Sequence, residues 1–329
     1  MRNLLFLIPF IFMGCSDTDQ KSVTIYVSED QVFSQPLLKD FEKETGVRVD
    51  AIYDTEESKS TGVMNRLIAQ KSNPQADVYW ANEPIRAEVL RQKGILSPYQ
   101  SPNAKGIPSI FQEKNHYWTG FSARIRVLVV NKSIKDEPTS ILDYTNPKFK
   151  GESVIANPLF GTTTAHISAL FSVWGKEKTE KFLKQLKENK TAISTGNGES
   201  ADFVADNSYA FSLVDSDDAI SRLRQGREIK IVYPDQKDGE VGVFVVPNAV
   251  MMIRNAPHPK MAKKLIDYLL SKKSEEKLAF ADCAQIPLHH GVAMPKELKP
   301  IDQIKVMKVD YARVAKEMME IQEYLKRFL

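Results

Sequence analysis

The sequence contains three aspartates within four positions, Asp215, Asp217 and Asp218, between an apolar run at residues 209–214 and a helical pattern that starts at Ala219. Carboxylate oxygens are hard ligands that suit Fe3+ or Ca2+, and they also pair with ammonium groups. The same residues fit a helix N-cap with an acidic first turn, for which one aspartate is sufficient. Because three adjacent negative charges repel one another unless a cation lies between them, we predict that all three are metal ligands.

Two polar turns before helical patterns are candidate oxyanion sites. Gly161 is followed by Thr162, Thr163 and Thr164, and Asn197 lies between two glycines. Helix N-termini have unpaired N–H groups and a partial positive charge, so both turns can hold an oxyanion. An ordinary N-cap is the alternative for each turn. Loops at strand ends are where open α/β sheets bind ligands, which favours one common site.

Signatures of the common enzyme classes are missing from the sequence. It has no GxSxG, Walker loop, GxGxxG, HExxH or CxxC motif. We expect His289 and His290 to be a solvent-exposed loop pair and His166 to be explained by packing in a helix. Cys283 is expected to be a small core residue rather than a nucleophile. The sequence therefore favours a binding protein over an enzyme.

Short strand patterns alternate with longer helix patterns, which predicts an α/β fold. The strand patterns at residues 23–28, 47–52 and 76–80 enclose helix patterns and indicate a parallel sheet, and a second series begins at 125–131. The other predicted elements are strands at 154–155, 209–214 and 229–233, hydrophobic stretches at 242–246 and 249–253, helices at 164–174, 176–189, 258–271 and 274–281, and a C-terminal helix with Val309, Val314, Met318, Ile321 and Leu325 on one face.

Length and composition indicate a two-lobed globular protein. The chain has 329 residues, of which 42% are hydrophobic, and at roughly 150 residues per domain this suggests two lobes with separate cores. The net charge of +3 is small and scattered, so it gives no reason to expect a nucleic-acid partner.

The N-terminus has the pattern of an export signal. Arg2 precedes an apolar run at residues 4–13, which is too short to span a bilayer because that takes about 20 residues. The position of Cys15 resembles a bacterial lipoprotein signal. We predict that residues 1–14 are a signal peptide, that Cys15 becomes lipidated, and that residues 15–22 form the tether; an unmodified Cys15 is the alternative.

The order of several segments resembles the extracellular solute-binding proteins of ABC importers, most closely the ferric-ion-binding group. The segments are VTIYVSEDQVFSQPLLKDFEKETGVRV, PQADVYWANEP, FSARIRVLVVNKS, ILDYTNPKFKGESVIANP and APHPKMAKKLIDYLLS. The resemblance implies a type II periplasmic-binding-protein fold: two α/β lobes joined by hinge strands, with a ligand held in the cleft between them. It also implies delivery of the ligand to a membrane permease with an ATPase.

Carrying the family's metal ligands onto this sequence gives an imperfect match. The adjacent tyrosines that ligate iron in ferric-binding relatives are matched here by Asp217 and Asp218. The family's histidine after the first strand is matched by Glu29 or Asp30, of which we choose Asp30. Its acidic ligand after the third strand is matched by Asn82 or Glu83, of which we choose Glu83. Without phenolates, iron should bind more weakly, and a different cargo becomes plausible.

The anion-holding positions of the family agree better in residue type. They fall on Gly161, Thr162, Thr163 and Asn197. The other candidates for ligand contact are Ser28 near the first strand end, and Arg124 and Arg126 at the expected lobe crossing, where an arginine would pair an anionic ligand or only the acidic loop.

We predict an extracytoplasmic lipoprotein that binds cargo for import. The expected cargo is a ferric ion or small ferric chelate with a synergistic oxyanion; the alternatives are an organic phosphate, phosphonate or polyamine, or, outside this class, a secreted hydrolase that uses Asp217 or Asp218 as general base. We expect a monomer without a catalytic cofactor that works with an ABC permease and ATPase. The expected domains are residues 23–122 with 248–290 for lobe 1, and 123–247 with 291–329 for lobe 2.

Overall fold

The first lobe is built on a parallel sheet. A computed structural model describes residues 21–54 and 61–328. Strand β1 pairs with β2 and β3 in parallel, with Tyr26 opposite both Ile52 and Tyr79. Gly46 ends the first helix in a left-handed conformation, with φ 68°. The elements are β1 (Ser22–Val27), α1 (Gln31–Thr45), β2 (Arg48–Tyr53), α2 (Thr61–Ala69), β3 (Val78–Ala81), α3 (Pro84–Gln92) and β4 (Leu96–Ser97), followed by the short 3-10 helices η2 (Pro102–Ala104) and η3 (Ser109–Phe111).

The second lobe repeats this construction. Strand β6 pairs in parallel with β7 and β8, and Gly175, with φ 80°, separates α4 from α5. Its elements are η4 (Ile141–Thr145), η5 (Pro147–Phe149), β6 (Ser153–Ala156), α4 (Gly161–Trp174), α5 (Lys176–Glu188), β7 (Ala192–Ser194), α6 (Asn197–Ala205), β8 (Phe211–Asp215), α7 (Ser216–Arg224) and β9 (Ile229–Val232).

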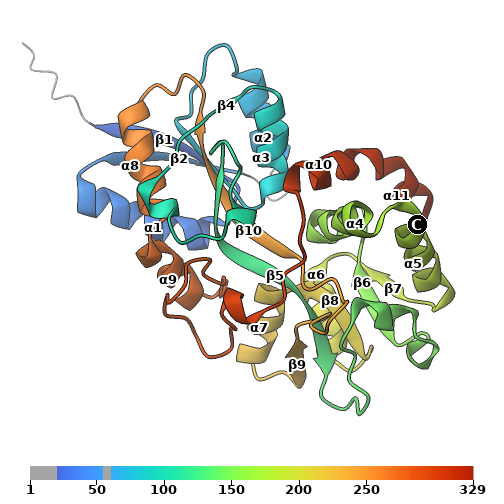
Figure 1. Ribbon diagram of the computed structural model, residues 1–329. Helices are drawn as coiled ribbons and strands as arrows, with labels where there is room; N and C mark the ends of the chain where they lie inside the picture. Colours follow the sequence, from blue (N-terminus) through green and yellow to red (C-terminus); the bar gives the residue numbers. More distant parts are fainter. Residues whose placement is uncertain (1–20, 55–60, 329) are drawn as a thin grey trace, which may run out of the picture.

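Two long strands connect the lobes (Figure 1). Strands β5 (Thr119–Asn131) and β10 (Val245–Ile253) are antiparallel neighbours in one sheet of order β2-β1-β3-β10-β5-β8-β6-β7. Residues 119–125 of β5 pair with β10, whereas residues 126–130 pair with β8. The predicted domain boundary between residues 122 and 123 falls within this crossing.

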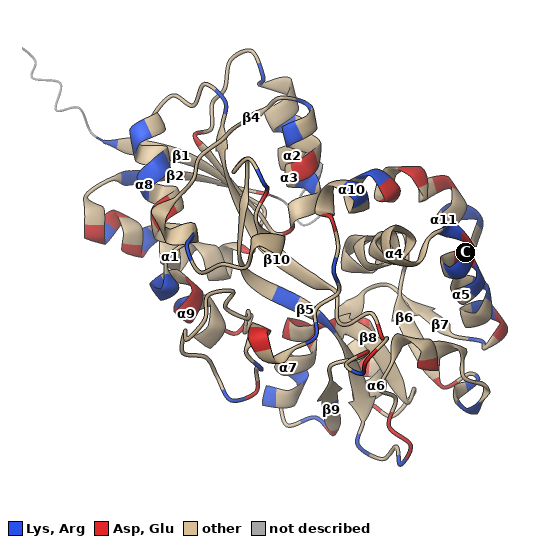
Figure 2. Cartoon of the chain, in the orientation of Figure 1, with Lys and Arg blue, Asp and Glu red and all other residues tan. Residues whose placement is uncertain are grey.

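Of the remaining helices, α8 and α9 lie on the first lobe, α10 lies across the junction, and α11 packs against α4 and α5 of the second lobe. Helix α10 packs against both α3 and α4, and the hydroxyl of Tyr311 at its start donates to the carbonyl of Val245, 2.8 Å away. Most charged residues lie on helices and loops, and the long crossing strand β5 carries basic positions (Figure 2). The last elements are α8 (Pro259–Leu269), α9 (Lys272–Phe280), η6 (Ile301–Gln303), α10 (Tyr311–Glu320) and α11 (Gln322–Phe328).

The predicted α/β class is confirmed, with differences in detail. The hydrophobic stretches at 242–246 and 249–253 contribute to one strand, which begins only at Val245, and the C-terminal helix is divided into α10 and α11. Helix α3 was not predicted, whereas α6 begins at the turn around Asn197 after which a helix was expected. Among the described helices none is both long and apolar enough to cross a bilayer. The predicted signal peptide and Cys15 lie outside the described residues.

Candidate ligand-binding site

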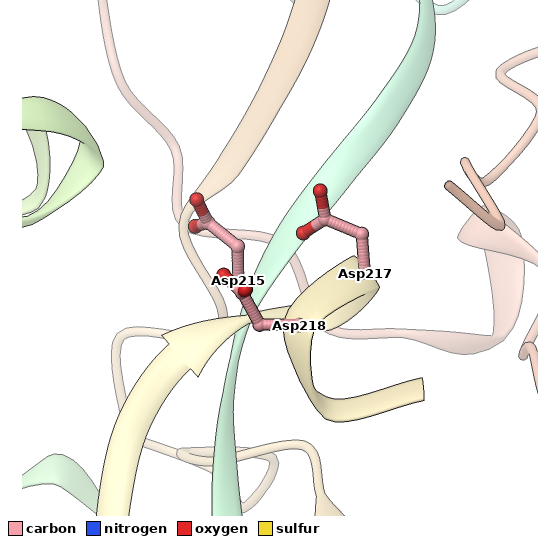
Figure 3. Close-up of side chains that lie close together, drawn as sticks. All are labelled: Asp215, Asp217 and Asp218. Atoms are coloured by element: carbon pink, nitrogen blue, oxygen red, sulfur yellow. The ribbon is translucent and has the colours of Figure 1, made fainter. Parts of the chain in front are cut away.

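The three predicted aspartates come together where β8 ends and α7 begins (Figure 3). Asp215 is the last residue of the strand and the N-cap of the helix, and Asp217 and Asp218 are in the first helical turn. One carboxylate oxygen of each lies within 4.8 Å of the others. A buried strand that runs directly into a helix therefore concentrates three negative charges at one edge of the sheet.

Asp215 is engaged by a buried arginine. The Nη1 atom of Arg126 lies 2.9 Å from Oδ1 of Asp215, and the other carboxylate oxygen accepts a hydrogen bond from Thr162, 2.7 Å away. Arg126 also donates to Asn197 and Thr163, at 2.9 and 3.2 Å. Because Arg126 and Asp215 are opposite each other on β5 and β8, the strand register produces this pair. Of the two arginines on the crossing strand, Arg126 thus forms an ion pair with Asp215 of the acidic loop.

Three helix N-termini converge around this ion pair. Helices α4, α6 and α7 begin at Gly161, Asn197 and Ser216, and Thr162, Thr163 and Asn197 all hydrogen-bond to Arg126. Their first-turn N–H groups have no intrahelical acceptor and add a positive potential. The hydroxyl of Thr164 instead donates to the carbonyl of Pro158, 2.7 Å away, which fixes the turn before α4. The predicted oxyanion loops and the acidic loop therefore lie together around Arg126.

Asp217 and Asp218 are held in an unfavourable environment for two carboxylates. Burial, and then repulsion within the acidic cluster, raises the pKa of both side chains. The guanidinium of Arg222 lies 3.6 Å from Asp218, and Arg124 acts on Asp217 in the same sense; both oppose the shift. Oδ1 of Asp217 is buried and has no hydrogen-bond partner among the described residues. A cation at this position would relieve the repulsion and satisfy the buried oxygen.

Arg124 is influenced by carboxylates of both lobes. Its Nη2 atom donates to the carbonyl of Asn82, 2.7 Å away. Burial alone would lower the pKa of Arg124, but the charges of four carboxylates, Asp215 and Asp217 from one lobe and Glu29 and Asp30 from the other, outweigh burial and raise it. Carboxylates of both lobes therefore act on one guanidinium.

The lobe 1 candidates differ in their roles. The hydroxyl of Ser28 is 2.9 Å from that of Tyr79 and 3.2 Å from a carboxylate oxygen of Asp54. Asp30 is the N-cap residue of α1, without a side-chain capping hydrogen bond. Glu83 caps α3 by accepting from the Ile85 and Arg86 backbone, and it pairs with the Arg86 guanidinium at 2.8 Å. Glu83 thus orders a helix start beside the site.

The buried histidines and the cysteine lie outside the acidic cluster. The prediction of an exposed histidine pair is wrong for His289, which is buried and hydrogen-bonds to the fully buried Glu275 at 2.8 Å, while His290 is exposed. Glu275 lies on α9, so spacing alone did not reveal this contact. His166 packs against Phe244, with ring centroids 5.4 Å apart, and burial lowers its pKa to about 3. Cys283 is buried, as predicted.

Comparison with known proteins supplies the family. Residues 37–303 match the model of the bacterial extracellular solute-binding proteins. The chain belongs to this family. This solute-binding protein is 25% identical over 300 residues to "Iron uptake protein A1" of Synechocystis sp., and the match covers 85% of this chain and 81% of that protein. It is 23% identical over 311 residues to the "Putative 2-aminoethylphosphonate-binding periplasmic protein" of Salmonella typhimurium, covering 92% and 88%.

Solved structures confirm the two-lobed fold. The solute-binding protein superimposes on the Trichodesmium protein solved with iron and citrate ligands with a TM-score of 0.82, at 22% identity, covering 93% of this chain and 99% of that one. The sequence resemblance to the ferric-ion-binding group of the family is confirmed by these proteins, and one of the relatives is named as a putative 2-aminoethylphosphonate-binding protein.

Proposed function

We propose that this solute-binding protein captures a ferric ion or a small ferric chelate between its lobes and delivers it to an ABC permease and its ATPase. The observation that carries the proposal is the aspartate cluster, whose carboxylate oxygens converge within 4.8 Å. Asp217 and Asp218 would be the principal metal ligands because Asp215 is already paired with Arg126. Hard oxygen donors are the ligands that Fe3+ prefers over soft ones.

An oxyanion would complete the metal shell. The N–H groups at the starts of α4 and α6 lie next to the aspartates, and Arg124 and Arg126 add positive charge. These two guanidinium groups would repel a bare trivalent cation and weaken its binding. An anion bound to the cation would offset this repulsion. The proposed cargo therefore includes the anion, with Gly161, Thr162, Thr163 and Asn197 around it.

A second cargo of the same class is favoured by a specific observation. Asp217 and Asp218 stand where ferric-binding relatives have tyrosines, so no phenolate follows β8. A molecule that carries both an amine and a phosphonate would place its ammonium at these carboxylates and its phosphonate at the helix N-termini. A phosphonate-binding protein is among the relatives, which supports this alternative.

Cargo would act by drawing the lobes together. The proposed lobes are residues 23–122 with 248–290, and 123–247 with 291–329, and both contribute charge around Arg124. A cargo that contacts both walls binds the closed arrangement better than the open one and shifts the population by that difference. The proposed location is outside the cytoplasm, with residues 1–14 removed, a tether over residues 15–22, and a lipid on Cys15.

The cargo is tested by native mass spectrometry and metal analysis of the purified protein, followed by titration with ferric citrate and with 2-aminoethylphosphonate. Tight binding of ferric citrate supports the first proposal, and binding of only the phosphonate supports the second. Binding of neither, together with turnover of ester or phosphate substrates that requires Asp217 or Asp218, would replace both with the hydrolase alternative.

A further inference from the structure

The crossing between the lobes contains a β-bulge at Ser122. Ala123 pairs with Pro247 and Phe121 with Asn248, so Ser122 has no partner residue on β10. Ser122 also has φ 37°, in the left-handed region that non-glycine residues rarely occupy. Its N–H donates to Glu275, 2.9 Å away, and its carbonyl accepts from the Asn248 side chain at 2.7 Å. Two buried side chains thus replace the missing backbone partners of the bulge.

Asn248 extends this network to the ligand side of lobe 1. Its Oδ1 accepts from the indole N–H of Trp80 at 2.9 Å, and its Nδ2 donates to Oε1 of Gln285 at 2.7 Å. Nε2 of Gln285 in turn donates to the carboxylate of Glu29, 3.1 Å away. All of these side chains are buried. A continuous hydrogen-bonded path therefore runs from Glu29 to the bulge at Ser122.

The same path includes the third chain segment at the junction. Ala123 and Ile286 exchange two backbone hydrogen bonds of 2.8 Å, which ties residues 284–286 to β5. Ala284, next to Gln285, has φ 42°, a second left-handed non-glycine residue. Such conformations persist only where the surroundings enforce them, and they concentrate at functional sites. The two strained residues lie on the two segments that this network joins.

Glu29 is the lobe 1 carboxylate at which this hydrogen-bonded path ends. It follows Ser28 at the carboxyl end of β1 and precedes Asp30, the N-cap of α1. Its charge acts on Arg124 and on Cys283, and on both of them together with Asp217 of the other lobe. Carboxylates of both lobes therefore act to raise the pKa of the same guanidinium and of the same thiol.

We propose that Glu29 contacts cargo and that Gln285 is the positioning residue through which this contact is coupled to the bulge at Ser122. This inference rests on the proposed function, because it assigns a role at the same site. When bound cargo shifts the Glu29 carboxylate, the Gln285 amide must move with it or lose their hydrogen bond. Because Asn248, on β10, is hydrogen-bonded to both Gln285 and the Ser122 carbonyl on β5, a movement of Gln285 changes the contacts of both crossing strands. Binding and the geometry of the crossing are thereby linked.

The tryptophan indole resonances give a direct readout, since the chain has only three tryptophans. Gallium citrate serves as the probe. Ga3+ has the same charge as Fe3+ and a similar radius, but it is diamagnetic and therefore does not broaden the resonances. We expect saturating gallium citrate to shift the Trp80 indole N–H resonance and to leave that of Trp174, on α4, in place. In Gln285→Met the Trp80 shift should be lost although the probe still binds. An equal Trp80 shift in Gln285→Met would overturn the inference.

A double-mutant cycle separates positioning from a general loss of stability. Gln285→Met should weaken binding of ferric citrate by roughly tenfold, and this loss should disappear in the Glu29→Gln background. Additive losses, or unchanged affinity in Glu29→Gln, would contradict the proposal. Asn189→Leu removes a buried amide outside the network, which donates to the carbonyls of Tyr144 and Asn146, and should leave affinity unchanged.

Failure of the proposed function can be distinguished from failure of this inference. If wild type binds neither ferric nor gallium citrate, the titrations are repeated with 2-aminoethylphosphonate. If that also fails, the cargo proposal falls, and with it the assignment of Glu29 as a cargo contact. The coupling itself is then measured without cargo: Glu29→Gln should shift the Trp80 resonance, whereas Asp50→Asn, which removes a carboxylate paired with Arg48 in the same lobe, should not.

Discussion

Arg126 and Asp215 form a buried ion pair that joins the crossing strand β5 to the acidic end of β8, with 2.9 Å between Nη1 and Oδ1. Both oxygens of Asp215, one of the three predicted metal ligands, accept hydrogen bonds from within the lobe. The surrounding protein compensates the negative charges of Asp217 and Asp218 less completely than that of Asp215.

Replacing Arg126 by Met should destabilise the protein strongly. The substitution leaves the Asp215 carboxylate buried without its cation, and breaking a buried pair in this way costs about 3–5 kcal/mol. Equilibrium unfolding in urea measures the loss. Lys132→Met is the matched control because its pair with Glu228 is exposed, 3.3 Å long, and expected to contribute no more than about 1 kcal/mol. Similar losses in the two variants would show that Arg126 is not acting through its buried pair.

The double variant Asp217→Asn, Asp218→Asn should lose cargo while the empty protein becomes more stable near neutral pH. Removing both charges abolishes the repulsion in the cluster, and neutral amides no longer attract a cation. We expect affinity for the cationic cargo to fall at least tenfold, by about 1.4 kcal/mol or more. Titration calorimetry measures affinity, and thermal melting at pH 7.5 measures stability. Asp206→Asn, at an ion pair with Arg227, controls for loss of one carboxylate from this lobe.

Cargo binding should release protons, and affinity should rise with pH. Burial and repulsion raise the pKa of Asp217 and Asp218 above the ordinary value of 3.8, so the pair retains protons that a cation must displace. A carboxyl group with a raised folded-state pKa stabilises the protein below its unfolded pKa, and this contribution is lost as pH rises through the folded value. Calorimetry in buffers of different ionisation enthalpy counts the protons. No release between pH 5 and neutrality would contradict the shift.

The acidic loop and the two oxyanion loops were predictable because each depends on local order. A buried strand followed directly by a helix places the next residues at one edge of the sheet, and parallel strands bring several such edges together. Asp215, Thr162 and Asn197 come from different strand–helix turns, yet they meet in the structure through Arg126. Strand and helix patterns therefore predicted that these residues lie close together, without any knowledge of their contacts.

The roles within the site were not predictable because they depend on register and on distant residues. That Arg126 pairs Asp215 follows from the position of β5 beside β8, which no local pattern fixes. Burial of His289 depends on Glu275, and the bulge at Ser122 depends on Asn248, which is far away in sequence. Such contacts appear only when the complete sheet is assembled.

Two glycines at the start of α6 provide a test of whether Arg222 influences cargo binding through its contact with Asp218. A Cβ at Gly198 would lie 3.2 Å from Nη2 of Arg222 and 3.4 Å from a carboxylate oxygen of Asp218, whereas one at Gly196 would meet no atom within 4 Å. Gly198→Ala should therefore displace Arg222 from Asp218 and change cargo affinity several-fold, while Gly196→Ala leaves affinity unchanged. Both affinities are measured by calorimetric titration with the same cargo. Equal affinities in Gly198→Ala and wild type would mean that Arg222 adjusts without disturbing Asp218, and that the arginine does not tune the cluster.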